Sequence, residues 1–112
     1  MRSDRLRGHL RTLLLAAVAA HEPAHGYALI SALAGASDGY FAFNEGAVYP
    51  SLHQLEADRM ITSTWDSSTG RRRRVYELTA SGRRQLEADA ADWHRFRECV
   101  ESVLKEVPWL NP

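Results

Sequence analysis

The spacing of apolar residues changes twice along this chain, and the two changes define its fold class. Up to about residue 58, apolar residues recur every three or four positions, which is the spacing of helices packed on a core. From Ile61 to Leu78 they alternate on either side of the turn-forming run Asp66–Gly70, as in a β-hairpin. A heptad-like spacing resumes at Leu86. We therefore predict a mainly α fold with a β-hairpin wing, namely a winged helix-turn-helix followed by one long C-terminal helix.

The helical part predicts three helices. The first spans about residues 4–21, the second about 25–35, and the third follows the N-cap residue Asn44. Pro23 separates the first two, because a proline disfavours helix in the residue before it. Pro50 leaves two possibilities, a kink after the first turn of the third helix or a start later than Asn44. The residues expected to face the core are Leu6, Leu10, Leu13, Leu14 and Val18 in the first helix, Tyr27, Ile30 and Leu33 in the second, and Val48, Leu52 and Leu55 in the third.

Local chemistry adds three boundaries. The alternation Phe41-Ala42-Phe43 after Gly39 allows a short extended segment before the third helix. Thr79 is a candidate N-cap of the last helix, as is Ser81, and Pro108 is expected to end that helix. We place a domain boundary after residue 84, so that residues 1–84 form the winged-helix domain and residues 85–112 the C-terminal helix.

The formal charge of zero conceals an uneven distribution. Thirteen of the 14 basic residues are arginine. Residues 1–84 carry eleven arginines against eight acidic residues, whereas residues 85–112 carry three basic residues against six acidic ones. A basic body suggests a polyanionic partner, and an acidic tail suggests a different role for the C-terminal helix.

The hairpin carries four consecutive arginines, Arg71, Arg72, Arg73 and Arg74. Alternation along a strand places Arg71 and Arg73 on one face and Arg72 and Arg74 on the other. One interpretation is a charged edge strand that protects the sheet from aggregation. The other is a wing that grips phosphate or the minor groove while the third helix enters the major groove.

The third helix would supply the base contacts of such an interface. Ala47, Ser51, Gln54 and Asp58 are expected opposite its apolar stripe, and the Gln54 amide can both donate to and accept from an adenine edge. Tyr49 flanks this row and suits a phosphate contact, with a half-buried ring packed on the wing as its alternative. The predicted DNA-binding residues are Asn44, Ala47, Tyr49, Ser51, His53, Gln54, Arg71, Arg72, Arg73 and Arg74.

Several motifs, taken in order, resemble the PadR family of transcriptional regulators. The most specific are Gly46-Ala47-Val48-Tyr49-Pro50, Leu55-Glu56, Gly70-Arg71-Arg72, Tyr76-Glu77-Leu78-Thr79 and Gly82, and the resemblance covers about residues 5–105. It implies a cytoplasmic bacterial homodimer that binds a pseudo-palindromic operator on double-stranded DNA, usually as a repressor, and is released by a small molecule or another signal. Two positions depart from the family pattern. Ala47 stands where the family often has Thr, and Arg59 stands where Gly is common, at a predicted left-handed helix end.

The C-terminal helix is similar to that of the small subfamily, whose dimers form through this helix and the first one. In some members a tryptophan on this helix lines a pocket for a flat aromatic ligand between the subunits, and Trp93 resembles it. A small aromatic effector is therefore a candidate partner, and a filled dimer seam is the alternative. The residues expected at the effector site or dimer interface are Leu86, Ala90, Trp93, Phe96, Arg97, Val100 and Leu104.

The sequence contains no motif typical of an enzyme or of a cofactor site. The nucleophile elbow, the P-loop, the Rossmann fingerprint and the zincin motif are absent, and the five histidines lack ligand spacing, so we expect no catalysis, metal or cofactor. The single cysteine, Cys99, fits a reducing cytoplasm and is expected to be a small buried hydrophobe. No run of about 20 apolar residues predicts a membrane span. The main alternative function is a winged-helix protein-interaction module that does not bind DNA.

Overall fold

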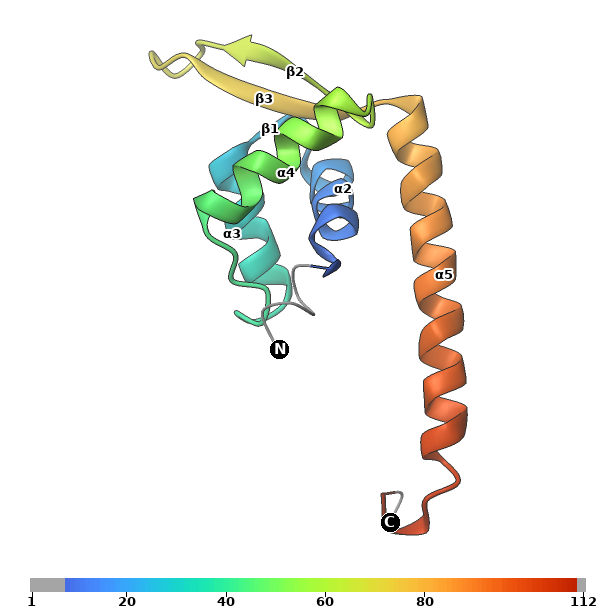
Figure 1. Ribbon diagram of the computed structural model, residues 1–112. Coiled ribbons are helices and arrows are strands. Elements are labelled where there is room, and N and C mark those ends of the chain that lie inside the picture. The colour runs from blue at the N-terminus through green and yellow to red at the C-terminus, as the bar shows by residue number, and fades with distance from the viewer. Residues whose placement is uncertain (1–7, 111–112) are drawn as a thin grey trace.

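The computed structural model describes residues 8–110 and has the predicted mainly α winged-helix architecture (Figure 1). The expected start of the first helix near residue 4, with Leu6, lies outside the described residues. The hairpin lies across one end of the body, and the last helix runs down its side and beyond it. The elements are α2 (Leu10–His21), β1 (Ala24–His25), α3 (Gly26–Ala36), α4 (Glu45–Ala57), β2 (Ile61–Asp66), β3 (Arg73–Leu78), α5 (Ala80–Leu104) and the 3-10 helix η1 (Pro108–Leu110).

One apolar core joins α2, α3, α4 and the sheet. Its fully buried side chains are Leu14, Leu15, Val18, Leu29, Val48, Leu52, Leu55, Ile61 and Tyr76. Burying each of the larger aliphatic side chains contributes about 1.5 to 3 kcal/mol. The stripe predicted for α3 is wrong at one position, because Tyr27 is 62% exposed. Leu29 turns inward instead, together with Gly26 and Leu33.

The three strands form an antiparallel sheet in the order β1-β3-β2. Ala24 pairs with Tyr76 and Trp65 pairs with Arg74. The extended segment that the sequence allowed at Phe41–Phe43 does not form, since residues 37–41 form turns and residues 42–44 no regular element. The backbone N–H of Phe41 donates to Ser37 Oγ at 2.9 Å, and the Phe41 and Phe43 rings are parallel, with centroids 6.2 Å apart. Both rings pack on the core, which explains the alternation without a strand.

The two ends of α4 follow the sequence prediction. Asn44 Oδ1 accepts the backbone N–H of Ala47 at 2.9 Å, so the helix begins at Glu45 and Pro50 lies in its second turn. The later start is therefore excluded. At the other end, Arg59 has a φ of 62°, which confirms the predicted left-handed residue. Met60 N donates to the Leu55 carbonyl and Arg59 N to the Glu56 carbonyl, which is the Schellman pattern of helix termination.

The start of α5 is locked against the end of α4. Thr79 is its N-cap, because Thr79 Oγ1 accepts the Gly82 N–H at 3.0 Å and donates to the Arg59 carbonyl at 2.7 Å. The Thr79 backbone N–H also donates to the Met60 carbonyl, at 3.1 Å. A Cβ atom on Gly82 would lie only 1.9 Å from that carbonyl oxygen. We call this contact the Met60–Gly82 junction.

Helix α5 has two parts with different surroundings. Its first turns lie on α2, where the Thr12 hydroxyl donates to Asp89 at 2.8 Å and Leu86 is half-buried. From residue 91 to residue 106 every residue is exposed, and the chain measures 58 Å along its longest axis. The helix ends at Leu104, one turn before the predicted end at Pro108. The domain boundary predicted after residue 84 falls inside this continuous helix and stays a prediction.

Candidate nucleic-acid interface

The exposed side of α4 is rotated relative to the row expected from the sequence. Ala47 and Ser51 are half-buried on the flank of the helix, and a hollow beside them is also lined by Leu10 of α2. The exposed row is Gly46, Pro50, His53, Gln54 and Ala57. Ala47 and Ser51 therefore do not face directly outward as expected, and Ala47 packs against the core. His53 and Gln54 remain accessible from outside.

Tyr49 lies on the opposite flank of α4 and is half-buried. A Cβ atom added at Gly26 would lie 2.6 Å from Tyr49 Cε1 and 2.7 Å from its hydroxyl oxygen. The ring therefore rests on the glycine that opens α3. The alternative interpretation of Tyr49 as a half-buried ring is therefore correct, but the ring packs on the start of α3 and not on the wing. A phosphate contact by its hydroxyl stays a prediction.

Gln54 is held by a short polar chain. Its Nε2 atom donates to Asp58 Oδ1 at 3.0 Å, and the other carboxylate oxygen of Asp58 forms an ion pair with Arg11 Nη2 at 2.7 Å. All three side chains are at the surface. Because Arg11 belongs to α2, these contacts connect Gln54, the candidate for base reading on α4, to the neighbouring helix.

The wing gathers two of its arginines around one aromatic ring. The guanidinium carbon of Arg72 lies 4.3 Å from the Trp65 ring centroid, and that of Arg74 lies 4.8 Å from it. Both distances are within the range of cation–π attraction. Arg72 precedes β3, so it reaches this ring from the turn rather than from a strand. The predicted pairing of Arg72 and Arg74 on one face is confirmed by their common partner.

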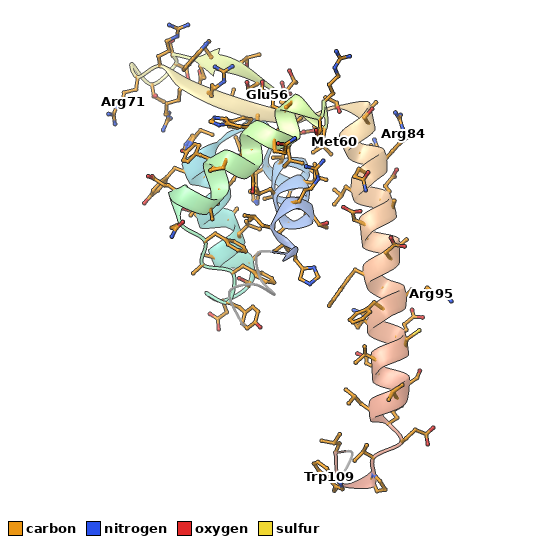
Figure 2. The ribbon with its side chains drawn as sticks, in the orientation of Figure 1. Glu56, Met60, Arg71, Arg84, Arg95 and Trp109 are labelled. Atoms are coloured by element: carbon orange, nitrogen blue, oxygen red, sulfur yellow. The ribbon has the colours of Figure 1, made fainter. Side chains whose placement is uncertain are left out.

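The same face of the wing connects to α4. Arg74 Nε donates to Ser63 Oγ at 3.0 Å, and the Ser63 hydroxyl donates to Glu56 Oε2 at 2.6 Å. Glu56 lies in the last turn of α4, and Figure 2 shows it where that helix meets the hairpin. An arginine of the wing is thus hydrogen-bonded, through one serine, to the helix that carries His53 and Gln54.

The other two wing arginines have different surroundings. Arg71 is exposed at the tip of the wing, as Figure 2 shows. Arg73 is half-buried and pairs with Asp66 across the sheet, and its Nη2 atom lies 3.4 Å from Thr69 Oγ1. A hydrogen bond from the Ser68 backbone lowers the pKa of Asp66, and the charge of Arg73 adds to this effect. The wing therefore presents Arg71, Arg72 and Arg74 to solvent, whereas Arg73 belongs to the turn.

The residues predicted at the effector site or dimer interface lie along one side of α5. Leu86 and Ala90 are half-buried, and the rest of the predicted row is exposed: Trp93, Phe96, Arg97, Val100 and Leu104. The Trp93 ring contacts the rings of His9 and Phe96, with centroids 6.0 Å and 5.9 Å apart. Trp93 lines neither of two hollows, of about 520 and 490 Å³, found elsewhere on the chain.

Two further observations concern the same helix. Cys99 is exposed in the single chain, as is every residue from 91 to 106, and its burial at a dimer interface stays a prediction. Among residues 8–110, none of the helices combines the length and the apolar character needed to cross a lipid bilayer.

Sequence reasoning missed three residues of this surface. Trp65, Ser63 and Glu56 were not candidates, although together they hold Arg72 and Arg74. The register of the hairpin was the signal that could have found Trp65. Pairing Ile61 with Leu78 and counting inward places Trp65 opposite Arg74. The hydrogen bond from Ser63 to Glu56 depends on the angle between α4 and the hairpin, which no local sequence pattern predicts.

Comparison with known proteins agrees with this geometry. Residues 14–88, about two thirds of the chain, match the "Transcriptional regulator PadR-like family". The transcriptional regulator Rv3488 of Mycobacterium tuberculosis is 37% identical over 67 residues, which are 60% of this chain and 56% of that protein. A PadR family transcriptional regulator from Eggerthella lenta is 32% identical, with a TM-score of 0.77 over 90% of this chain and 86% of that one. A PadR-like transcriptional regulator from Bacillus cereus is 29% identical, with a TM-score of 0.79 over 90% of this chain and 96% of that one. The wing, the helix beside it and these matches lead to one conclusion: the chain belongs to the PadR-like family of transcriptional regulators, which implies that it binds DNA.

Proposed function

We propose that two copies of this chain pair through α5 and α2 and bind a pseudo-palindromic operator, each copy using α4 and its wing, and that the dimer acts as a repressor. The observation that carries the proposal is the exposed apolar row on α5. Trp93 is 48%, Phe96 61% and Val103 68% exposed. A contiguous row of this kind on a charged helix marks an interaction surface. A second copy fits it best, because a twofold axis brings the same row from both copies into contact.

The DNA-facing part of the proposal rests on charge and position. Arg71, Arg72 and Arg74 are exposed on the wing, and His53 and Gln54 are exposed on the neighbouring helix. Phosphate contacts by the arginines would fix the orientation on the duplex, and the α4 side chains would read base edges. In a twofold dimer the two copies would meet two inverted half-sites, which is why a pseudo-palindrome is expected.

The effector part of the proposal rests on the ring cluster of His9, Trp93 and Phe96. A twofold axis near Trp93 would place two such clusters across a shared space, where a flat aromatic molecule could stack. Such a ligand releases DNA only if it binds the free dimer more tightly than the DNA-bound one. A seam filled by the two tryptophans is the alternative, and it would leave no room for a ligand.

The proposed role assigns no catalytic, metal or cofactor chemistry to the chain, and it places the protein in the cytoplasm with the chromosome. The proteins matched above are named as transcriptional regulators rather than enzymes. This assignment agrees with the exposed arginines of the wing, which suit a phosphate backbone.

The test combines two measurements on matched variants. Val100→Asp places a charge in the apolar row, whereas Ser102→Asp adds the same charge outside that row, where the Ser102 hydroxyl donates to the Glu98 carbonyl. Light scattering after size exclusion should give dimers for the wild type and Ser102→Asp and monomers for Val100→Asp. Fluorescence anisotropy with the DNA flanking the protein's own gene should show tight binding only for the dimeric forms. A monomeric wild type at micromolar concentration would contradict the proposal.

A further inference from the structure

The tryptophan of the wing makes contacts that the core of the protein does not require. Trp65 is 51% exposed, although it lies on a short, strongly basic hairpin. A large aromatic side chain in this position is not needed for the core, since the buried residue of the neighbouring pair is Tyr76 opposite Ser63. Its contacts are instead the guanidinium groups of Arg72 and Arg74.

The register fixes the side of the sheet on which this group lies. Residues that are paired across antiparallel strands share a face, and alternate residues along one strand do as well. Trp65 and Arg74 therefore share a face with Tyr76 and Ser63, and Ser63 hydrogen-bonds to α4 through Glu56. The stacked group thus lies on the side of the wing that faces α4.

Arg74 is restrained from two directions. The Trp65 ring covers its guanidinium group, and Ser63 Oγ accepts its Nε proton at 3.0 Å. The serine is in turn oriented by its 2.6 Å hydrogen bond to Glu56. Arg72 stacks on the same ring at 4.3 Å. A free arginine samples many rotamers, whereas this pair is held before any ligand arrives.

We propose that Trp65 is a positioning residue, which orders Arg72 and Arg74 for phosphate contact in the free protein and does not itself touch DNA. The inference rests on the proposed DNA-binding function and deepens it. Immobilising a long side chain at an interface ordinarily weakens binding by about twofold to tenfold. Because Arg72 and Arg74 are both ordered in advance, each of them avoids most of that loss. Trp65 therefore raises affinity without adding a contact.

The test separates affinity from the number of phosphate contacts. Trp65→Ala should weaken operator binding by about tenfold per subunit and leave the slope of log K against log salt unchanged, because both arginines still reach phosphate. Replacing both Arg72 and Arg74 by Ala removes four phosphate contacts from the proposed dimer and should reduce the magnitude of that slope by about four units. Trp65→Phe should keep most of the affinity, because it keeps a ring. Thr64→Ala, at the exposed neighbouring residue on the other face of β2, is the matched control and should bind as the wild type does.

A double-mutant cycle and a DNA-free readout complete the test. Adding Trp65→Ala to the protein that lacks both arginines should cause no further loss, because the tryptophan acts only through them. In the free protein, the Nε–H resonances of Arg72 and Arg74 should be shifted by the indole ring current and should move toward ordinary values in Trp65→Ala. Three results would overturn the inference alone: wild-type affinity for Trp65→Ala, a further loss in the triple variant, or a slope for Trp65→Ala equal to that of the arginine variant. A wild-type dimer that binds no duplex at low salt would overturn the proposed function as well.

Discussion

The substitution Gly82→Ala tests whether the Met60–Gly82 junction holds α5 against the end of α4 and the wing. The added Cβ would lie 1.9 Å from the Met60 carbonyl oxygen, and a comfortable contact requires about 3.5 Å, so the backbone must separate by roughly 1.5 Å. Overpacking of this kind costs about 1 to 3 kcal/mol. Moving the carbonyl also weakens its hydrogen bond from the Thr79 backbone N–H, at 3.1 Å, which contributes about 1 kcal/mol, whereas the Thr79 hydroxyl donates mainly to the Arg59 carbonyl, at 2.7 Å.

An opposing effect is smaller. Alanine is favoured over glycine within a helix by about 0.5 to 1 kcal/mol, so we expect a net loss of about 1 to 3.5 kcal/mol. Thermal unfolding at a fixed protein concentration should show a Tm lowered by about 4 to 17 °C. Gly35→Ala is the matched control, because Gly35 is exposed in α3 with no atom within 4 Å of its added Cβ, and it should be slightly stabilising. A Gly82→Ala protein as stable as the wild type would refute the reasoning.

Three further predictions follow from single residues. Arg59→Gly should stabilise the protein by up to about 1 kcal/mol, because Arg59 has a φ of 62°, which is strained for a residue other than glycine. Urea unfolding measures this change, and a loss of stability would mean that the contacts of the Arg59 side chain outweigh the backbone strain. Gln54→Ala should weaken binding to the preferred operator by about 1 to 3 kcal/mol and to random duplex much less, measured by anisotropy, and equal losses on both would exclude base readout. Trp93→Ala should destabilise the dimer by about 3 to 5 kcal/mol if the tryptophans fill a seam, whereas unchanged dimer stability with lost quenching by aromatic ligands would indicate a pocket.

Local chemistry in the sequence predicts most of the fold. The caps at Asn44 and Thr79 each depend on a residue and its immediate neighbours, and both are found where expected. The left-handed residue at Arg59 was expected from the family resemblance, and it is found as well. The errors share a different cause. Tyr27 was expected in the core and an extended segment was allowed at Phe41–Phe43, because the apolar pattern alone does not show which neighbouring element covers each side chain.

The candidate site was less predictable than the fold, because it depends on how elements meet. Ala47 and Ser51 satisfy the helical geometry of an outward row, yet α2 lies beside them. The arginine run was visible in the sequence, but its division between Trp65 and the turn follows from the hairpin register. The hydrogen bond from Ser63 to Glu56 joins residues seven positions apart across a change from helix to strand, which periodicity cannot describe.

The length of α5 has a mechanical consequence. At 1.5 Å per residue its 25 residues form a rigid arm of about 37 Å, anchored near one end by the Met60–Gly82 junction and the contacts to α2. A rotation of about 5° at that anchor moves the far tip by roughly 3 Å, so in the proposed dimer a shift of a few ångströms where the two tips meet would rotate each winged-helix body by only a few degrees. The angle of this arm would then set the separation of the two wings.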